Sequence, residues 1–89
     1  MDARTVLGHL EAVADQLGVE VRYEPMEGEA SFSSGGMCRI RGRPVIIVNS
    51  QAPAEERIRT FVRALKRLNL NHIYLRPGIR ALLEKDAEE

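Results

Sequence analysis

At residues 44–48 the chain reads Pro44-Val45-Ile46-Ile47-Val48, a continuous run of apolar residues. A run without polar alternation suits a central strand that is covered on both faces. Five residues after Val48, Pro53 stands where a first helical residue is favoured, and two glutamates follow it at the positive end of the helix. The stretch therefore predicts a buried strand that leads into a helix over residues 53–68.

Residues 53–68 place their apolar side chains at helical spacing, at Ile58, Phe61, Val62, Leu65 and Leu68. At 100° per residue, the opposite face carries Arg59, Arg63, Lys66 and Arg67, with Glu56 among them. One interpretation is a binding site for an anion or an acidic partner. The other is an ordinary solvated face, on which Glu55–Arg59 and Glu56–Arg63 pairs support the helix.

A hairpin is predicted just before this strand and helix. Residues 37–41 alternate, with Cys38 and Ile40 on one face, and a tight turn is expected at Gly42-Arg43. We expect Arg39, Arg41 and Arg43 to share a face, which makes Arg39 and Arg41 further candidate binding residues. The alternative is that Glu20 and Glu24 neutralise these arginines across neighbouring strands.

The remaining segments complete the pattern outward in both directions. Residues 3–17 have helical periodicity, with Asp2 as the N-cap and Gly18 at the end, and residues 19–24 alternate as a strand. The Gly- and Ser-rich residues 25–36 read as a mobile hairpin loop rather than a phosphate-binding one, since they precede a strand and lack a lysine. Residues 72–75 form a short extended piece, Pro77 opens a last helix, and residues 86–89 are expected to fray.

These elements predict one α+β domain over residues 1–89. We expect a small three-stranded, largely antiparallel sheet with helices mainly on one face, in the order α-β-β-β-α-(β)-α. The chain has no internal repeat and no linker long enough to divide it.

The composition of the chain indicates the cellular compartment of the protein and the kinds of partner that it can bind. The chain is 44% hydrophobic and 29% charged, and no apolar run approaches the roughly 20 residues of a membrane span, so no membrane association is expected. A single cysteine and no signal peptide indicate the reducing cytoplasm. The formal net charge of zero hides a segregation, because residues 1–36 hold seven acidic and two basic residues, whereas residues 37–80 hold ten basic and two acidic ones. Opposite blocks can neutralise each other or form a field for a partner.

The residues that could support catalysis or bind a metal are few. Cys38 lies on the apolar side of its strand, as a structural thiol would, and a nucleophile would need His9 or His72 as a base. No ligand spacing links these three residues. We therefore expect no catalytic residues, no metal and no cofactor.

Residues 44–68 resemble one known family. The stretch from Pro44 to Asn49, followed by the helical residues 57–68, is similar to the strand and active-site helix of zinc metallopeptidases of the ImmA/IrrE type. In that family the helix carries His-Glu-x-x-His, two zinc ligands one turn apart and a glutamate that activates water. Arg63 and Arg67 occupy the histidine positions here, and Ala64 occupies the glutamate position. The resemblance implies a shared scaffold without the zinc or the activity.

The favoured hypothesis is a non-catalytic protein-interaction or regulatory module, which binds another protein or a second copy of itself. The alternative is a nucleic-acid-binding module that uses the arginine-rich helix face, although the neutral charge and the scattered aromatic residues disfavour it. An enzyme that uses Cys38 or a histidine is the third hypothesis.

Overall fold

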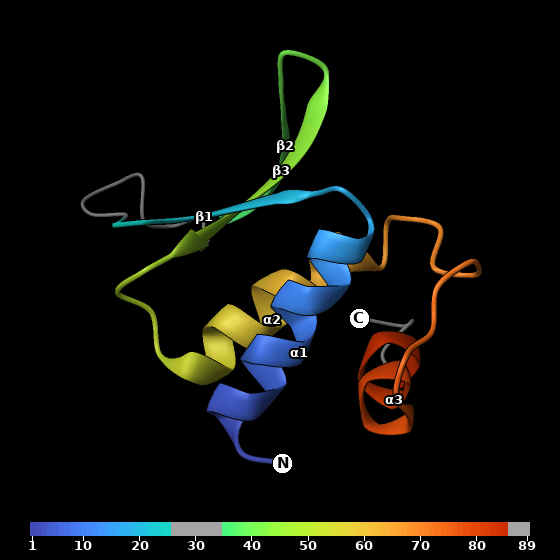
Figure 1. Cartoon of the computed structure of the whole chain (residues 1–89). Coiled ribbons are helices and arrows are strands. Elements are labelled where there is room, and N and C mark those ends of the chain that lie inside the picture. Colours follow the sequence, from blue (N-terminus) through green and yellow to red (C-terminus); the bar gives the residue numbers. More distant parts are fainter. Residues whose placement is uncertain (26–34, 86–89) are drawn as a thin grey trace.

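Six elements of regular structure are present in the computed structural model, which describes residues 1–25 and 35–85. They are α1 (Ala3–Gln16), β1 (Glu20–Glu24), β2 (Gly35–Ile40), β3 (Arg43–Asn49), α2 (Ala54–Leu65) and α3 (Pro77–Lys85) (Figure 1). The α+β class and the three strands confirm the prediction. The expected mobility of the loop at residues 26–34 and the fraying of 86–89 lie outside the described residues.

Strand β3 is the centre of the sheet, which has the order β1-β3-β2. It pairs antiparallel with β2, and it pairs parallel with β1, where Glu20 lies opposite Val45 and Glu24 opposite Asn49. The sheet is therefore mixed, and the expectation of a largely antiparallel sheet was wrong for β1. Alternation of apolar and polar residues fixes which face a side chain takes, but it does not fix the direction of the neighbouring strand.

Two segments differ from the sequence-based prediction. Residues 72–75 form no strand, because the Leu75 side chain is buried among the helices and neither sheet edge receives this segment. Gly35 and Gly36, which were expected in the loop, are the first residues of β2 and lie opposite Val48 and Ile47.

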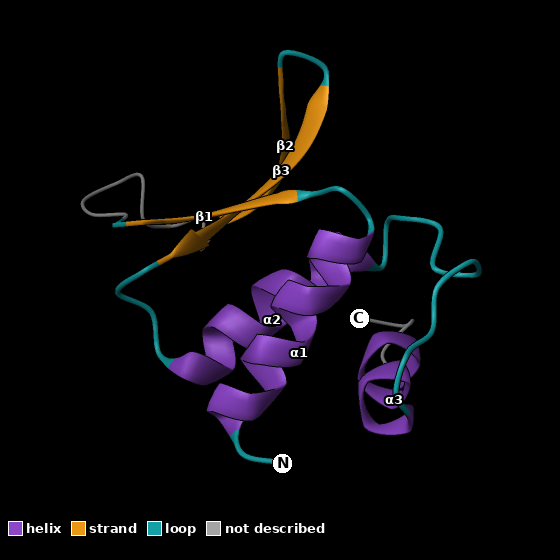
Figure 2. Ribbon diagram, viewed as in Figure 1, coloured by secondary structure: helices purple, strands orange, loops and turns teal. Residues whose placement is uncertain are grey.

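The helices form a layer on one side of the sheet (Figure 2). Helix α1 packs along α2, and α2 also contacts β2 and β3, while α3 packs against both other helices. The face of β3 that carries Ile46 and Val48 meets this layer, and both side chains are fully buried with Phe61 and Leu65 of α2. The prediction of helices mainly on one face is confirmed.

The opposite face of β3 carries Val45 and Ile47. Val45 is only 1% exposed, whereas Ile47 is half-buried, and neither belongs to the cluster that the helices form with the sheet. By register, Val45 lies between Glu20 of β1 and Cys38 of β2. The run 44–48 is thus largely covered on both faces, as its unbroken apolar sequence predicts.

Both long helices begin and end close to the expected residues. The Asp2 carboxylate accepts a hydrogen bond of 2.8 Å from the backbone N–H of Thr5, and Gly18 follows α1 with a φ of +74°. Helix α2 begins one residue after Pro53, which has extended backbone angles, and it ends at Leu65 rather than Leu68. None of the helices in residues 1–25 and 35–85 combines the length and hydropathy needed to cross a membrane.

The β2–β3 hairpin turns one residue earlier than expected. Arg41 and Gly42 both have positive φ angles, 55° and 79°, and Ile40 lies opposite Arg43. Two consecutive residues with positive φ define a type I′ turn, whose twist matches that of the strands it joins. The turn residues are therefore Arg41-Gly42, and Arg43 is the first residue of β3.

Candidate functional site

The four basic residues predicted on the second long helix do lie on one side of it. We call Arg59, Arg63, Lys66 and Arg67 the α2 basic face. Arg59 and Arg63 are exposed on the helix itself, Lys66 is its half-buried C-cap, and Arg67 is exposed in the turn that follows. The opposite side of α2 is the core side, with Phe61 and Leu65 fully buried. The helix therefore presents guanidinium groups outward because its apolar stripe holds the other side against the sheet and α1.

The fold makes little use of the exposed arginines of this face. Within residues 1–25 and 35–85, the side chains of Arg59, Arg63 and Arg67 form no hydrogen bond or ion pair, and the expected Glu55–Arg59 pair is not made. Arg57 behaves differently, since its guanidinium donates to the backbone carbonyls of Ala52 (2.9 Å) and Ser50 (3.3 Å). Arg57 thus holds the β3–α2 connection, and the three exposed arginines are available to a partner.

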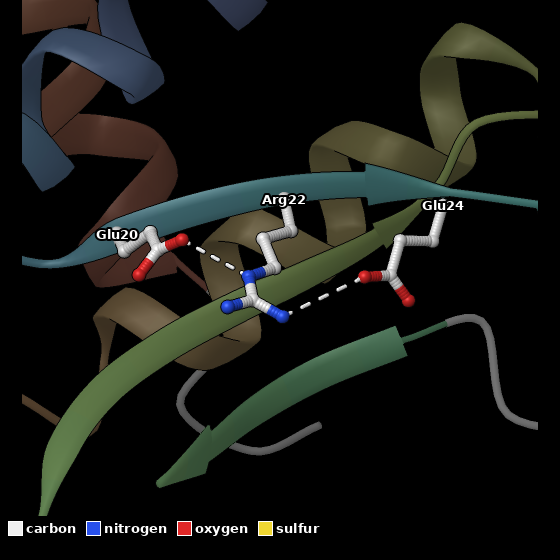
Figure 3. A network of polar contacts seen from close by, with 3 residues as sticks. All are labelled: Glu20, Arg22 and Glu24. Carbon is white, nitrogen blue, oxygen red and sulfur yellow. Dashed lines mark hydrogen bonds and ion pairs between the residues drawn. The ribbon is translucent and has the colours of Figure 1, made fainter. Parts of the chain in front are cut away.

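The acidic residues of β1 are engaged within their own strand. Arg22 Nε lies 2.9 Å from the Glu20 carboxylate, and Arg22 Nη1 lies 3.9 Å from that of Glu24 (Figure 3). The expectation that these glutamates neutralise the hairpin arginines was wrong, because β3 separates β1 from β2. Residues two apart in a strand share a face, so Arg22 lies between both carboxylates.

The predicted hairpin arginines do not share one face. Arg39 lies opposite Pro44, and Arg43 lies opposite Ile40, so their side chains leave opposite faces of the sheet, with Arg41 in the turn between them. The Arg39 guanidinium donates to the carbonyl of Gly42 at 2.9 Å, which closes the turn. The hairpin tip projects beyond the helical layer, apart from α2 (Figure 1). Arg39 and Arg41 therefore do not join the α2 basic face in a single surface.

Cys38 and the two histidines are not assembled into a site. Cys38 is half-buried on the sheet face away from the helices, whereas His9 lies on α1 beneath the other face, and His72 is exposed in the α2–α3 loop. Among the described residues, no three His, Cys, Asp or Glu side chains come together as metal ligands would. On α2, Arg63 is exposed and Ala64 is buried, and the resemblance of this helix to that of the zinc peptidases stays a prediction.

One polar contact links the sheet to α1. The Tyr23 hydroxyl donates a hydrogen bond to the carboxylate of Glu11. Burial raises the pKa of Tyr23 above its ordinary value of 10.0, and the hydrogen bond and the negative charge of Glu11 raise it further, since both oppose ionisation of the phenol. The contact engages another acidic residue of the N-terminal third.

A groove between α1 and α3 was not predictable from the sequence. We call it the Tyr74 groove; its cavity of about 200 Å³ is formed by α1, the loop before α3 and α3 itself. Tyr74 and Arg76 stand at the rim, and Tyr74 is 74% exposed. A second cavity of about 250 Å³ lies beyond Leu75, against Leu70 and Leu83. The available signal was the loop composition Asn-His-Ile-Tyr-Leu-Arg at 71–76, rich in side chains common at binding surfaces.

Comparison with known proteins gives no indication of what these surfaces bind. Comparison of the chain with protein-family models, with curated proteins and with solved structures gave no match.

Proposed function

We propose that this chain is a non-catalytic protein-interaction module that binds an acidic protein surface through the α2 basic face. The observation that carries the proposal is the contrast between the two charge groups. Arg59, Arg63 and Arg67 are exposed without an intramolecular partner in the described residues, while acidic side chains on β1 and α1 are occupied by Arg22 and Tyr23. In the described residues, the fold leaves the three exposed arginines of the proposed surface unneutralised.

The geometry suits carboxylates. Arg59 and Arg63 are one helical turn apart, which places them about 6 Å from each other along the axis at 1.5 Å per residue. A guanidinium binds a carboxylate through two parallel hydrogen bonds, and it loses less hydration than an ammonium group does. Two adjacent arginines on a rigid helix can therefore hold two carboxylates of a partner in a fixed register.

A protein partner fits these residues better than a nucleic acid does. Glu55 and Glu56 stand in the first turn of the same helix and would repel a phosphate backbone. The aromatic side chains that could stack on bases are elsewhere, with Phe61 in the core and Tyr23 bonded to Glu11. The hairpin tip, whose arginines would be needed to lengthen a phosphate track, projects beyond the helical layer and apart from α2 (Figure 1).

The test is a charge reversal with a matched control. The variant R59E/R63E/R67E changes the α2 basic face, and R39E/R41E/R43E gives the same change in net charge on the hairpin. Wild-type protein would be used for affinity capture from native cytosol, with bound proteins identified by mass spectrometry. Binding of the purified partner would then be measured by calorimetry at several salt concentrations, next to thermal melting and to sedimentation of the protein alone.

The proposal predicts that only R59E/R63E/R67E loses the partner, with an unchanged melting temperature. Loss of binding in the hairpin variant alone would move the site to the hairpin. Equal binding by all three proteins would leave the α2 basic face as ordinary solvated surface. A nucleic-acid ligand would appear as a steep log-linear salt dependence, with a slope of about −2.7 for three phosphate contacts, and would contradict the proposal.

A further inference from the structure

The Tyr74 groove has an apolar floor supplied by the core and a polar rim supplied by exposed side chains. Val13 of α1 and Ile79 of α3 are buried at the floor together with Leu75. In the loop before α3, the side chain of Leu75 turns inward. Its two neighbours, Tyr74 and Arg76, are therefore exposed at the rim. Two segments distant in sequence, α1 and residues 74–79, therefore form one concave surface.

Tyr74, at the rim of the groove, is more exposed than Tyr23. Tyr74 is 74% exposed as a residue, against 41% for Tyr23, whose hydroxyl is bonded to Glu11. Within residues 1–25 and 35–85 the Tyr74 side chain makes no hydrogen bond. Tyrosine and arginine are the residue types that most often dominate binding energy at protein interfaces, because a large, stiff side chain buries much area at a small entropic cost.

The size of the groove selects the kind of occupant. Sites that enclose a small molecule usually have about 300–1,000 Å³ and bury most of the ligand. The Tyr74 groove has about 200 Å³ and is open to solvent on one side, so it suits a single apolar side chain that a larger partner inserts.

The charge of the residues that line the Tyr74 groove further limits which protein segment can occupy it. Arg76 and His9 line the groove, as does the amide of Gln16, and none of the carboxylates in residues 1–25 and 35–85 does. The neighbouring Arg80 is paired with Glu84 at 3.5 Å and lines the other cavity, so Arg76 is the cation that faces an occupant here. A carboxylate next to the inserted side chain would complement it.

We propose that the Tyr74 groove docks a protein segment in which an apolar side chain enters the cavity and an adjacent carboxylate pairs with Arg76. The segment would lie against the Tyr74 ring. This surface is separate from the α2 basic face, so the proposal does not depend on the function proposed above. It requires only residues on α1, α3 and the loop that precedes α3.

The probe is a set of three capped tetrapeptides, Ala-Leu-Glu-Ala, its amide isostere Ala-Leu-Gln-Ala and the truncated Ala-Ala-Glu-Ala. Each would be titrated into the full chain at millimolar concentrations, and methyl and amide NMR shifts would be recorded. The proteins compared would be wild type, Tyr74→Ala, Arg76→Gln and, as the matched control on the hairpin away from the groove, Arg43→Gln. Both rim residues are exposed, so their variants should keep the wild-type spectrum outside the groove.

We expect the Leu-Glu peptide to shift the methyl signals of Val13 and Ile79, and each of the other two peptides to bind about tenfold more weakly, as loss of one charged hydrogen bond or one buried side chain implies. Arg76→Gln should abolish the preference for Glu over Gln, Tyr74→Ala should weaken all binding, and Arg43→Gln should change nothing. Absence of shifts at Val13 and Ile79, or equal binding of the Glu and Gln peptides by wild type, would overturn the proposal. Shifts at the same methyl groups on raising the protein concentration without peptide would assign the groove to a second copy and overturn it as well.

Discussion

Arg22 decides how the charges of the N-terminal third are distributed over the surface. It lies between Glu20 and Glu24 on one strand, with all three side chains about half exposed. Exposed ion pairs of this kind contribute little stability, typically about 0–1 kcal/mol. For the function proposed above, they matter because they engage acidic groups of the chain within β1 itself.

Tyr23 gives the protein a dependence of stability on alkaline pH. The folded state holds the phenol neutral, because burial and the bond to Glu11 raise its pKa, whereas the unfolded chain releases this proton near pH 10.0. The contribution is therefore complete below pH 10 and is lost as the pH rises above that value. Urea unfolding in a pH series through 10 should show a decline in stability that is smaller in Tyr23→Phe. Tyr74→Phe is the control, and an equal decline in all three proteins would contradict the assignment.

Two glycines at α1 should respond to alanine with opposite signs. Gly8 is exposed within the helix, with open space around the position of an added Cβ, so Gly8→Ala should stabilise the protein by about 0.5–1 kcal/mol through helix propensity. Gly18 has a φ of +74°, where a side chain is strained, so Gly18→Ala should destabilise it by about 1 kcal/mol. Urea unfolding measures both, and stabilisation by Gly18→Ala would contradict the end of α1 described here.

At the scale of elements, Arg41 in the β2–β3 turn adds a surface charge but is poorly suited to the backbone angles of its position. Arg41 has a φ of 55°, which asparagine adopts more readily, and Asn-Gly is the preferred pair for a type I′ turn. Arg41→Asn should therefore raise stability by about 0.5 kcal/mol, within the cost of a left-handed residue. Thermal melting checks the change, and Arg41→Ala is the control that removes the charge without favouring the turn. Equal melting temperatures for both variants would argue against the strained turn.

The elements show which features periodicity can predict. The helix and strand positions followed from apolar spacing and from Asp2, Gly18 and Pro53, since these act within a few residues. The turn was placed one residue late because Gly42 was assigned to its first position, and only the backbone angles show that Arg41 shares the positive φ. The direction of β1 escaped prediction because a parallel and an antiparallel neighbour impose the same alternation.

The same distinction holds for the surfaces. The α2 basic face was predictable, since one helix presents all of its residues and the apolar stripe fixes the orientation. The Tyr74 groove was not, because it exists only where α1, the loop and α3 meet. Arg39 and Arg43 were assigned to one face on the assumption that the turn came later, so a shift of one residue reversed the face of Arg43 relative to Arg39.

For the whole molecule, the side of β3 that faces the helices should carry most of the stability. Ile46 is fully buried in the shared core and Ile47 is half-buried on the other face. Ile46→Ala should cost about 2–5 kcal/mol, a large part of the about 5–15 kcal/mol typical of a domain, and Phe61→Ala should cost a similar amount. Ile47→Ala should cost distinctly less than Ile46→Ala in the same urea experiment. A larger loss at Ile47 would mean that the outer face, not the helical layer, is the main core.

The two pairings of β3 also imply an order of folding. Its contact with β2 begins between residues 40 and 43 and can form locally, whereas its contact with β1 joins residue 20 to residue 45 and must close a much longer loop. We therefore expect the hairpin to be present in the transition state and β1 to dock after it. In stopped-flow measurements Val21→Ala should mainly accelerate unfolding, while Gly42→Ala should mainly slow folding. The strand that engages the acidic residues would then be the last part of the sheet to form and the first to detach.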